Sequence, residues 1–103
     1  MTRPEILDAA KACVCGKRQN EYGNPENNFQ TIAEFWSAYL KCPIAAHDVA
    51  AMMALLKIAR IAGGIGSDDC WIDLAGYAAC GGEIAANFPE KVMGFSVKEE
   101  FYG

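Results

Sequence analysis

The sequence lacks an excess of positive charge. Nine Lys and Arg residues stand against thirteen Asp and Glu residues, which leaves a formal net charge of −4. Because broad contact with a nucleic-acid backbone requires a surplus of Lys and Arg, this balance argues against general binding of DNA or RNA. It remains compatible with a small local pocket of positive charge.

Metal ligands and disulfide partners are also scarce. His47 is the single histidine, and the five cysteines form no C-x-x-C pair. The odd number of cysteines argues against a disulfide framework, so we expect free thiols, most of them buried. No serine–histidine–acid or cysteine–histidine set can be assembled, and the sequence therefore identifies no catalytic residue.

Long apolar runs are missing too. The first residues show no cationic stretch followed by an apolar one, and no uninterrupted apolar segment is long enough to span a bilayer. We therefore expect a cytoplasmic protein without membrane contact.

The residues that are present favour one helical domain. The chain has 103 residues, enough for a single core, and 52% of them are hydrophobic. Caps and apolar periodicity predict helices over about 3–15, 25–40, 47–62 and 68–86. We predict an all-α fold, a compact bundle of about four helices over residues 1–86. An irregular, apolar C-terminal tail at 87–103 is expected to pack on the bundle or on a second subunit, which favours a homo-oligomer.

The helix starts differ in quality. Thr2 and Glu5 have the spacing of a capping box around the first-turn proline. The third helix follows Ala45, which is a poor cap unless His47 or Asp48 supplies the missing contact.

Large side chains on the helical stripes predict the core. Trp36 and Met53 recur at helical spacing with other apolar residues, and so do Trp71 and Met52. We interpret all four as core residues, although either tryptophan could also wall a pocket.

The first candidate site is a basic, aromatic loop. Lys17, Arg18 and Tyr22 precede the helix start at Asn24-Pro25. Free backbone N–H groups at a helix start suit phosphate, the guanidinium offers a planar donor fork, and the tyrosine ring can stack on a base. Taken alone, the loop fits better with a solvated turn in which Tyr22 anchors the chain.

The second candidate site is a set of charges on the last two helices. Asp69 and Asp73 are four residues apart and repel each other unless a Mg²⁺ ion or nearby cations relieve the repulsion. Lys57 and Arg60 are the candidate cations if the two helices are antiparallel neighbours, which would make a buried polar cluster. A structural salt-bridge network and a Mg²⁺–phosphate site are both open interpretations, with Tyr77 one turn further on to orient a carboxylate or a ligand.

These positions also carry a resemblance to a known family. Over residues 6–83 the chain resembles a family of small phage and prophage proteins of unknown function. The shared motifs are Arg18-x-x-x-Tyr22-Gly23, Asn28-Phe29, Trp36-Ser37-Ala38-Tyr39-Leu40, Asp48-Val49-Ala50, Lys57-Ile58-Ala59-Arg60, Asp69-x-Trp71-x-Asp73 and Gly76-Tyr77-Ala78-Ala79. The resemblance implies a phage-type protein that acts in the cytoplasm of the host cell.

The layout is more distantly similar to the all-α nucleoside triphosphate pyrophosphohydrolases of the MazG and dimeric dUTPase kind. That similarity implies an oligomeric bundle that binds Mg²⁺ through E-x-x-E and E-x-x-D pairs. The chain departs from this pattern, since it offers D-x-x-x-D at Asp69 and Asp73 and only Glu26 and Glu34 on the second helix. A Mg²⁺ cage is therefore incomplete in sequence, and no general base is identified.

Three functional hypotheses follow. The first is a protein that binds a linear or cyclic nucleotide without turning it over, and so sequesters a nucleotide signal from host defence. Its binding residues would be Lys17, Arg18, Tyr22, Asn28, Lys57, Arg60 and Tyr77. The second is a Mg²⁺-dependent nucleoside triphosphate pyrophosphohydrolase with Asp69 and Asp73 as metal ligands, and the third is a structural helical oligomer module. The incomplete acidic set favours the first over the second.

Overall fold

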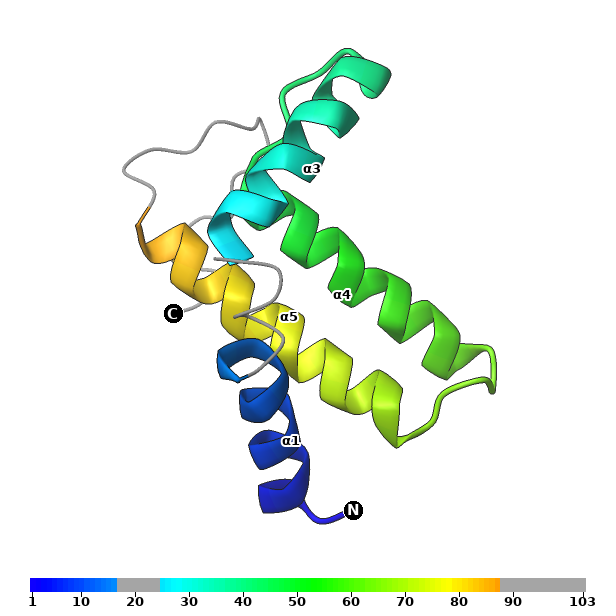
Figure 1. The fold of residues 1–103 in the computed structure, drawn as a ribbon. Helices are drawn as coiled ribbons and strands as arrows, with labels where there is room; N and C mark the ends of the chain where they lie inside the picture. The colour runs from blue at the N-terminus through cyan, green and yellow to red at the C-terminus, as the bar shows by residue number, and fades with distance from the viewer. Residues whose placement is uncertain (17–24, 88–103) are drawn as a thin grey trace, which may run out of the picture.

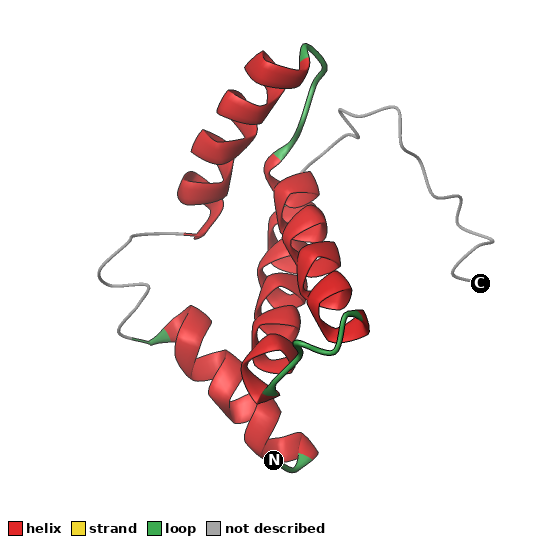
Figure 2. Cartoon of the chain, turned by 90° about the vertical axis from the view of Figure 1, so that its right-hand side faces the viewer, coloured by secondary structure: helices red, strands yellow, loops and turns green. Residues whose placement is uncertain are grey.

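The computed structural model describes residues 1–16 and 25–87, without the side chains of residues 25–27. These ranges form four helices and contain no strand (Figure 2). The helices are α1 (Arg3–Cys15), α3 (Pro25–Leu40), α4 (Ala46–Ala62) and α5 (Asp68–Ala86). The predicted all-α bundle of about four helices is confirmed, whereas the tail at 88–103 lies outside the described residues.

Helix α1 begins with the predicted capping box. The backbone N–H of Glu5 donates to Thr2 Oγ1 at 3.3 Å, and the Thr2 N–H donates to Glu5 Oε1 at 2.7 Å. This second bond is the main reason why the pKa of Glu5 is lowered. The helix ends at Gly16, where a Cβ atom would collide with the carbonyl oxygen of Ala12.

Helix α4 begins without a capping side chain at its N-cap residue, Ala45. Asp48 supplies the contact instead, because its Oδ2 accepts the Ala45 N–H at 2.9 Å. A carboxylate in the first turn also suits the positive end of the helix dipole. Two residues were expected to compensate for the poor cap at Ala45, and Asp48 is the one that makes this bond. The other, His47, has its Nε2 atom 3.8 Å from Asp48 Oδ1.

Helices α4 and α5 form an antiparallel hairpin, which Figure 1 shows at the centre of the molecule. A Cβ atom at Gly81 would lie 3.0 Å from Ala50 Cβ, so the two backbones approach closely there. Further along, Lys57 of α4 meets Asp73 of α5. Residues later in α4 thus contact residues earlier in α5, as expected for an antiparallel pair of helices.

The other two helices cover different parts of this hairpin. Helix α3 lies across it near the start of α4 and the end of α5 (Figures 1 and 2). The buried cluster there draws on all three helices and contains Phe29, Ala33, Ala46, Val49, Ala50, Cys80 and Ile84. Helix α1 packs on α5, where a Cβ at Gly76 would lie 3.2 Å from Val14 Cγ1.

The connection between α3 and α4 is closed by one serine. Ser37 Oγ accepts the Ile44 N–H at 2.8 Å and lies 3.2 Å from the Ile44 carbonyl oxygen, to which it donates. Lys41 has a positive φ of 58°, which reverses the chain between the two bonded residues. The turn therefore holds the end of α3 to the start of α4.

Two core predictions are wrong. Trp36 and Met53 pack against the buried cluster as expected, but Trp71 and Met52 are exposed. Apolar residues lie nearly all round α4 and α5, so their spacing alone did not identify which side of each helix faces the core.

The cysteine prediction is confirmed in part. All five thiols are free. Only Cys70 and Cys80 are buried, whereas Cys15 and Cys42 are exposed, so the expectation that most are buried is wrong. None of the described helices is long and apolar enough to cross a membrane.

Candidate functional site

An ion pair joins the C-terminal half of α4 to the N-terminal half of α5. Lys57 Nζ lies 2.9 Å from Asp73 Oδ2, and the two side chains are 18% and 33% exposed. This distance is that of a charge-assisted hydrogen bond. Because the surrounding helices shield most of both side chains, the pair is held in one arrangement more firmly than a surface ion pair.

The environment of Lys57 favours its charged form. The hydrogen bond to Asp73 raises the pKa of Lys57, and burial works in the opposite direction. The charge of Asp73 and the acidic groups of Tyr77 and Cys70 reinforce the upward shift. Lys57 is therefore an ammonium group throughout the physiological pH range.

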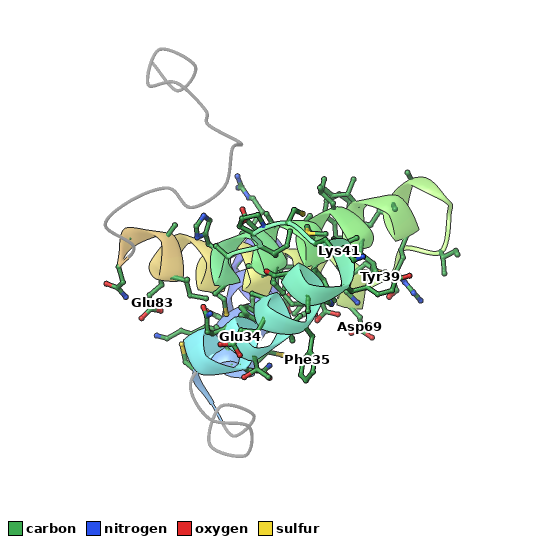
Figure 3. All side chains as sticks on the ribbon, turned by 90° about the horizontal axis from the view of Figure 1, so that it is seen from above. Glu34, Phe35, Tyr39, Lys41, Asp69 and Glu83 are labelled. Atoms are coloured by element: carbon green, nitrogen blue, oxygen red, sulfur yellow. The ribbon has the colours of Figure 1, made fainter. Side chains whose placement is uncertain are left out.

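Arg60 and Asp69 lie one helical turn from this pair, on the side of the loop that joins the two helices. Both are exposed, and neither forms an ion pair with another residue in the ranges 1–16 and 28–87. Figure 3 shows Asp69 well away from Glu83, which lies towards the other end of α5. The predicted buried cluster of four charges is therefore wrong, because it consists of one shielded pair and two exposed groups.

Tyr77 extends the site towards α3. Its ring centroid lies 6.2 Å from that of Phe29, with the planes tilted by 38°. Phe29 belongs to the buried cluster, while the preceding residue, Asn28, is exposed. The start of α3 thus brings an aromatic side chain against Tyr77 of α5.

We call the set of Lys57, Arg60, Asp69, Asp73 and Tyr77 the charged edge. Its members come from two helices whose register the ion pair fixes. The predicted residues Lys17, Arg18 and Tyr22 lie outside the described residues, so the structure does not relate them to this edge.

The described residues do not by themselves fit a Mg²⁺ cage. Within the described ranges, no group of three or more His, Cys, Asp or Glu side chains is placed to hold a metal ion. One oxygen of Asp73 is already bonded to Lys57, and Asp69 stands one turn away. Glu34 is exposed on α3, and the side chain of Glu26 is not described.

A second feature of the hairpin is a shallow groove between α4 and α5. Its volume is about 240 Å³. The lining is mostly alanine and glycine and consists of His47, Ala50, Ala51, Ala54, Tyr77, Ala78, Gly81, Gly82 and Ala85. The small residues of α5 indicated close helix packing in the sequence, but the groove also needs Ala51 and Ala54 of α4, and only the register places them opposite α5.

Comparison with known proteins assigns the chain to a family. Residues 5–85 match a domain of unknown function designated DUF6378. The chain belongs to this family. All five residues of the charged edge lie inside the region that matches the DUF6378 domain.

Two relatives come from mycobacteriophages. The Gene 55 protein of Mycobacterium phage D29 is 44% identical over 75 residues, which cover 73% of this chain and 50% of that protein. The Gene 55 protein of Mycobacterium phage L5 is 40% identical over 74 residues, 71% of this chain and 47% of its own length. The chain thus spans about half the length of these relatives. No solved structure matches it.

The expected resemblance to phage proteins of unknown function is confirmed by these matches. The more distant similarity to MazG-like pyrophosphohydrolases stays a prediction.

Proposed function

We propose that the chain binds a nucleotide or a nucleotide-derived signal at the charged edge and holds it without turnover. The observation that carries the proposal is the contrast between two cations on α4. Lys57 is fixed by Asp73 at 2.9 Å, whereas Arg60, one turn away, is exposed and forms no ion pair with the described side chains. A phosphate group would find a guanidinium fork whose donors are available.

The fixed pair supports this role in a second way. An ammonium group held by one carboxylate oxygen keeps further N–H donors, which can point to another acceptor. Because the pair is shielded on two sides by α4 and α5, an anion at Arg60 would lie beside a cation of fixed position. A fixed donor loses less conformational entropy on binding than a free lysine does.

Two more members of the charged edge, Asp69 and Tyr77, and also Asn28 of α3, could contact the base and sugar of a nucleotide. Asn28 offers an exposed amide for hydrogen bonding to a base, and Tyr77 lies one turn beyond Asp73. Asp69 is exposed and would serve as an acceptor for sugar hydroxyls. The sequence adds Lys17, Arg18 and Tyr22 to the same proposal.

Binding without turnover is the version that we propose, because the described side chains form no metal cage and the sequence identifies no general base. A phage protein that holds a nucleotide signal in this way would remove it from host defence. The Mg²⁺-dependent pyrophosphohydrolase is the competing hypothesis, with Asp69 and Asp73 as its ligands.

A nucleotide panel tests the proposal. Linear and cyclic nucleotides are added with Mg²⁺, and both the melting temperature and the chemical state of the nucleotide are measured. We expect one ligand class to raise the melting temperature and to be recovered intact. Release of pyrophosphate would favour the hydrolase instead, and no shift with any nucleotide would contradict the binding site.

Arg60→Ala locates the site within the chain. Because a hydrogen bond to a charged group contributes roughly 1.5–3 kcal/mol, we expect the affinity to fall by about tenfold or more. Arg3→Ala is the matched control, since it removes the same charge from an exposed position on α1. Equal losses in the two variants would show only a general charge effect and would remove Arg60 from the site.

A further inference from the structure

The side of α4 that faces away from α5 is exposed and apolar. From Ala51 to Ala62 this side carries no charged residue, and in Figure 1 no other helix covers it. Leu55 is 62% exposed and Ile58 is 47% exposed. A helix that is apolar nearly all round is normally buried, and exposed apolar patches of this kind mark interaction sites.

We call Leu55 and Ile58 the α4 ridge. The ridge borders the shallow groove, because Leu55 lies one helical turn beyond Ala51 of the groove and Ile58 one turn beyond Ala54. Large side chains on one strip thus stand next to a strip of alanine and glycine. The ridge protrudes and the groove is recessed, and the two lie side by side.

We propose that the α4 ridge and the groove form a two-fold interface between two copies of this chain. In a two-fold dimer the same patch meets itself, so a ridge beside a groove can place each ridge on the groove of the partner. The absence of charge on the outer face of α4 beyond its first turn supports the same occupant. A two-fold axis places identical charges opposite each other across the interface, where they repel. This part of α4 carries no charge that could repel its copy.

The estimated contact area agrees with a specific dimer of moderate affinity. The 17 residues of α4 extend about 25 Å, and a face two helices wide measures roughly 20 Å across. Each copy would therefore contribute about 500 Å², and the two together about 1,000 Å², the lower bound for a specific interface. We accordingly expect dissociation in the micromolar range rather than a permanent complex.

The interface does not depend on the nucleotide proposal. Arg60 lies two residues beyond Ile58, and residues at that spacing point to different sides of a helix. The charged edge and the ridge can therefore fail or succeed separately.

Sedimentation equilibrium of the full chain tests the interface. The wild-type chain should approach twice the 11.1 kDa mass of one copy at tens of micromolar. Leu55→Glu should raise the dissociation constant at least tenfold, because it would place an unpaired charge in the contact. Gly82→Leu should do the same by filling the groove, and no atom lies within 4 Å of the Cβ that it introduces.

Leu7→Glu is the matched control, because Leu7 lies on α1 and is 63% exposed, about as much as Leu55. It should leave the dissociation constant unchanged. A wild-type chain that stays monomeric, or assembles into a dimer that neither Leu55→Glu nor Gly82→Leu weakens, would overturn the proposal. Equal weakening by the control would overturn it too. Circular dichroism confirms that each variant is folded.

Discussion

The Lys57–Asp73 pair allows a quantitative test of the site. Removing either partner leaves the other without its hydrogen bond, so a double-mutant cycle of Lys57→Met and Asp73→Ala isolates their interaction. Exposed ion pairs contribute roughly 0.2–1 kcal/mol, and hydrogen bonds to charged groups roughly 1.5–3 kcal/mol. With a 2.9 Å contact and exposures of 18% and 33%, the pair belongs between these classes, and we expect a coupling of about 1–2 kcal/mol.

Urea denaturation followed by circular dichroism measures the four free energies of unfolding in the cycle. All four proteins are compared at one protein concentration, so that any self-association affects them alike. Lys11→Met, on the exposed surface of α1, is the control for the loss of a lysine charge. A coupling below about 0.3 kcal/mol would mean that the pair does not form in solution, and would refute the register on which the charged edge depends.

The pH dependence of this coupling gives an independent test. The pKa of Lys57 is raised above 10.5 in the folded chain. Its stabilisation is therefore fully present below about pH 10.5 and is lost as the pH rises through the higher folded-state pKa. The coupling should be equal at pH 7 and pH 9 and should fall only above that range. A decline between pH 7 and pH 9 would contradict the assignment of the effect to the lysine.

Two further predictions concern α5 and the cysteines. Gly82→Ala should stabilise the chain by roughly 0.8–1 kcal/mol, because alanine favours a helix and nothing lies within 4 Å of the new Cβ. Gly81→Ala should lose most or all of that gain, since its Cβ would lie 3.0 Å from Ala50 Cβ, and equal melting temperatures for the two variants would contradict the close packing. Burial raises the pKa of the Cys80 thiol, so iodoacetamide should modify exposed Cys42 much faster than Cys80 in the folded chain. Mass spectrometry of the modified peptides would show the order, and equal rates would contradict the burial of Cys80.

Local signals in the sequence predicted most of the helices. Thr2 and Glu5 have the spacing of a capping box at a helix start, and the structure shows both of their hydrogen bonds. Asp48 was one of two residues expected to compensate for the weak cap at Ala45, and it accepts the bond. These contacts involve neighbours in the chain, so their geometry follows from spacing alone.

Contacts between helices were harder to predict. The facing of Lys57 and Asp73 followed from the assumption that α4 and α5 are antiparallel, and the structure confirms that pair. The same assumption did not show that Arg60 and Asp69 are exposed, because burial depends on what α1 and α3 cover. Trp71 was misplaced for the same reason, since α5 offers more apolar positions than its neighbours can bury.

The bond from Ser37 to Ile44 was not anticipated at all. Its partners are seven residues apart and lie across a turn in which Lys41 takes a positive φ. A lysine gives no local signal for that conformation, unlike glycine or asparagine. Such a bond can be found only when the end of α3 and the start of α4 have been placed in space.

The position of α1 has a consequence for how the chain opens. Ala10 is the single buried residue of this helix, and none of the residues of the buried cluster belongs to it. Helix α1 can therefore detach from α5 at a lower free-energy cost than is needed to unfold α3, α4 and α5. Its amide protons would exchange with solvent through this partial opening, while those of Val49 and Ile84 would wait for global unfolding. A ligand that touched both α1 and α5 would slow exchange in α1 without changing the exchange of the core.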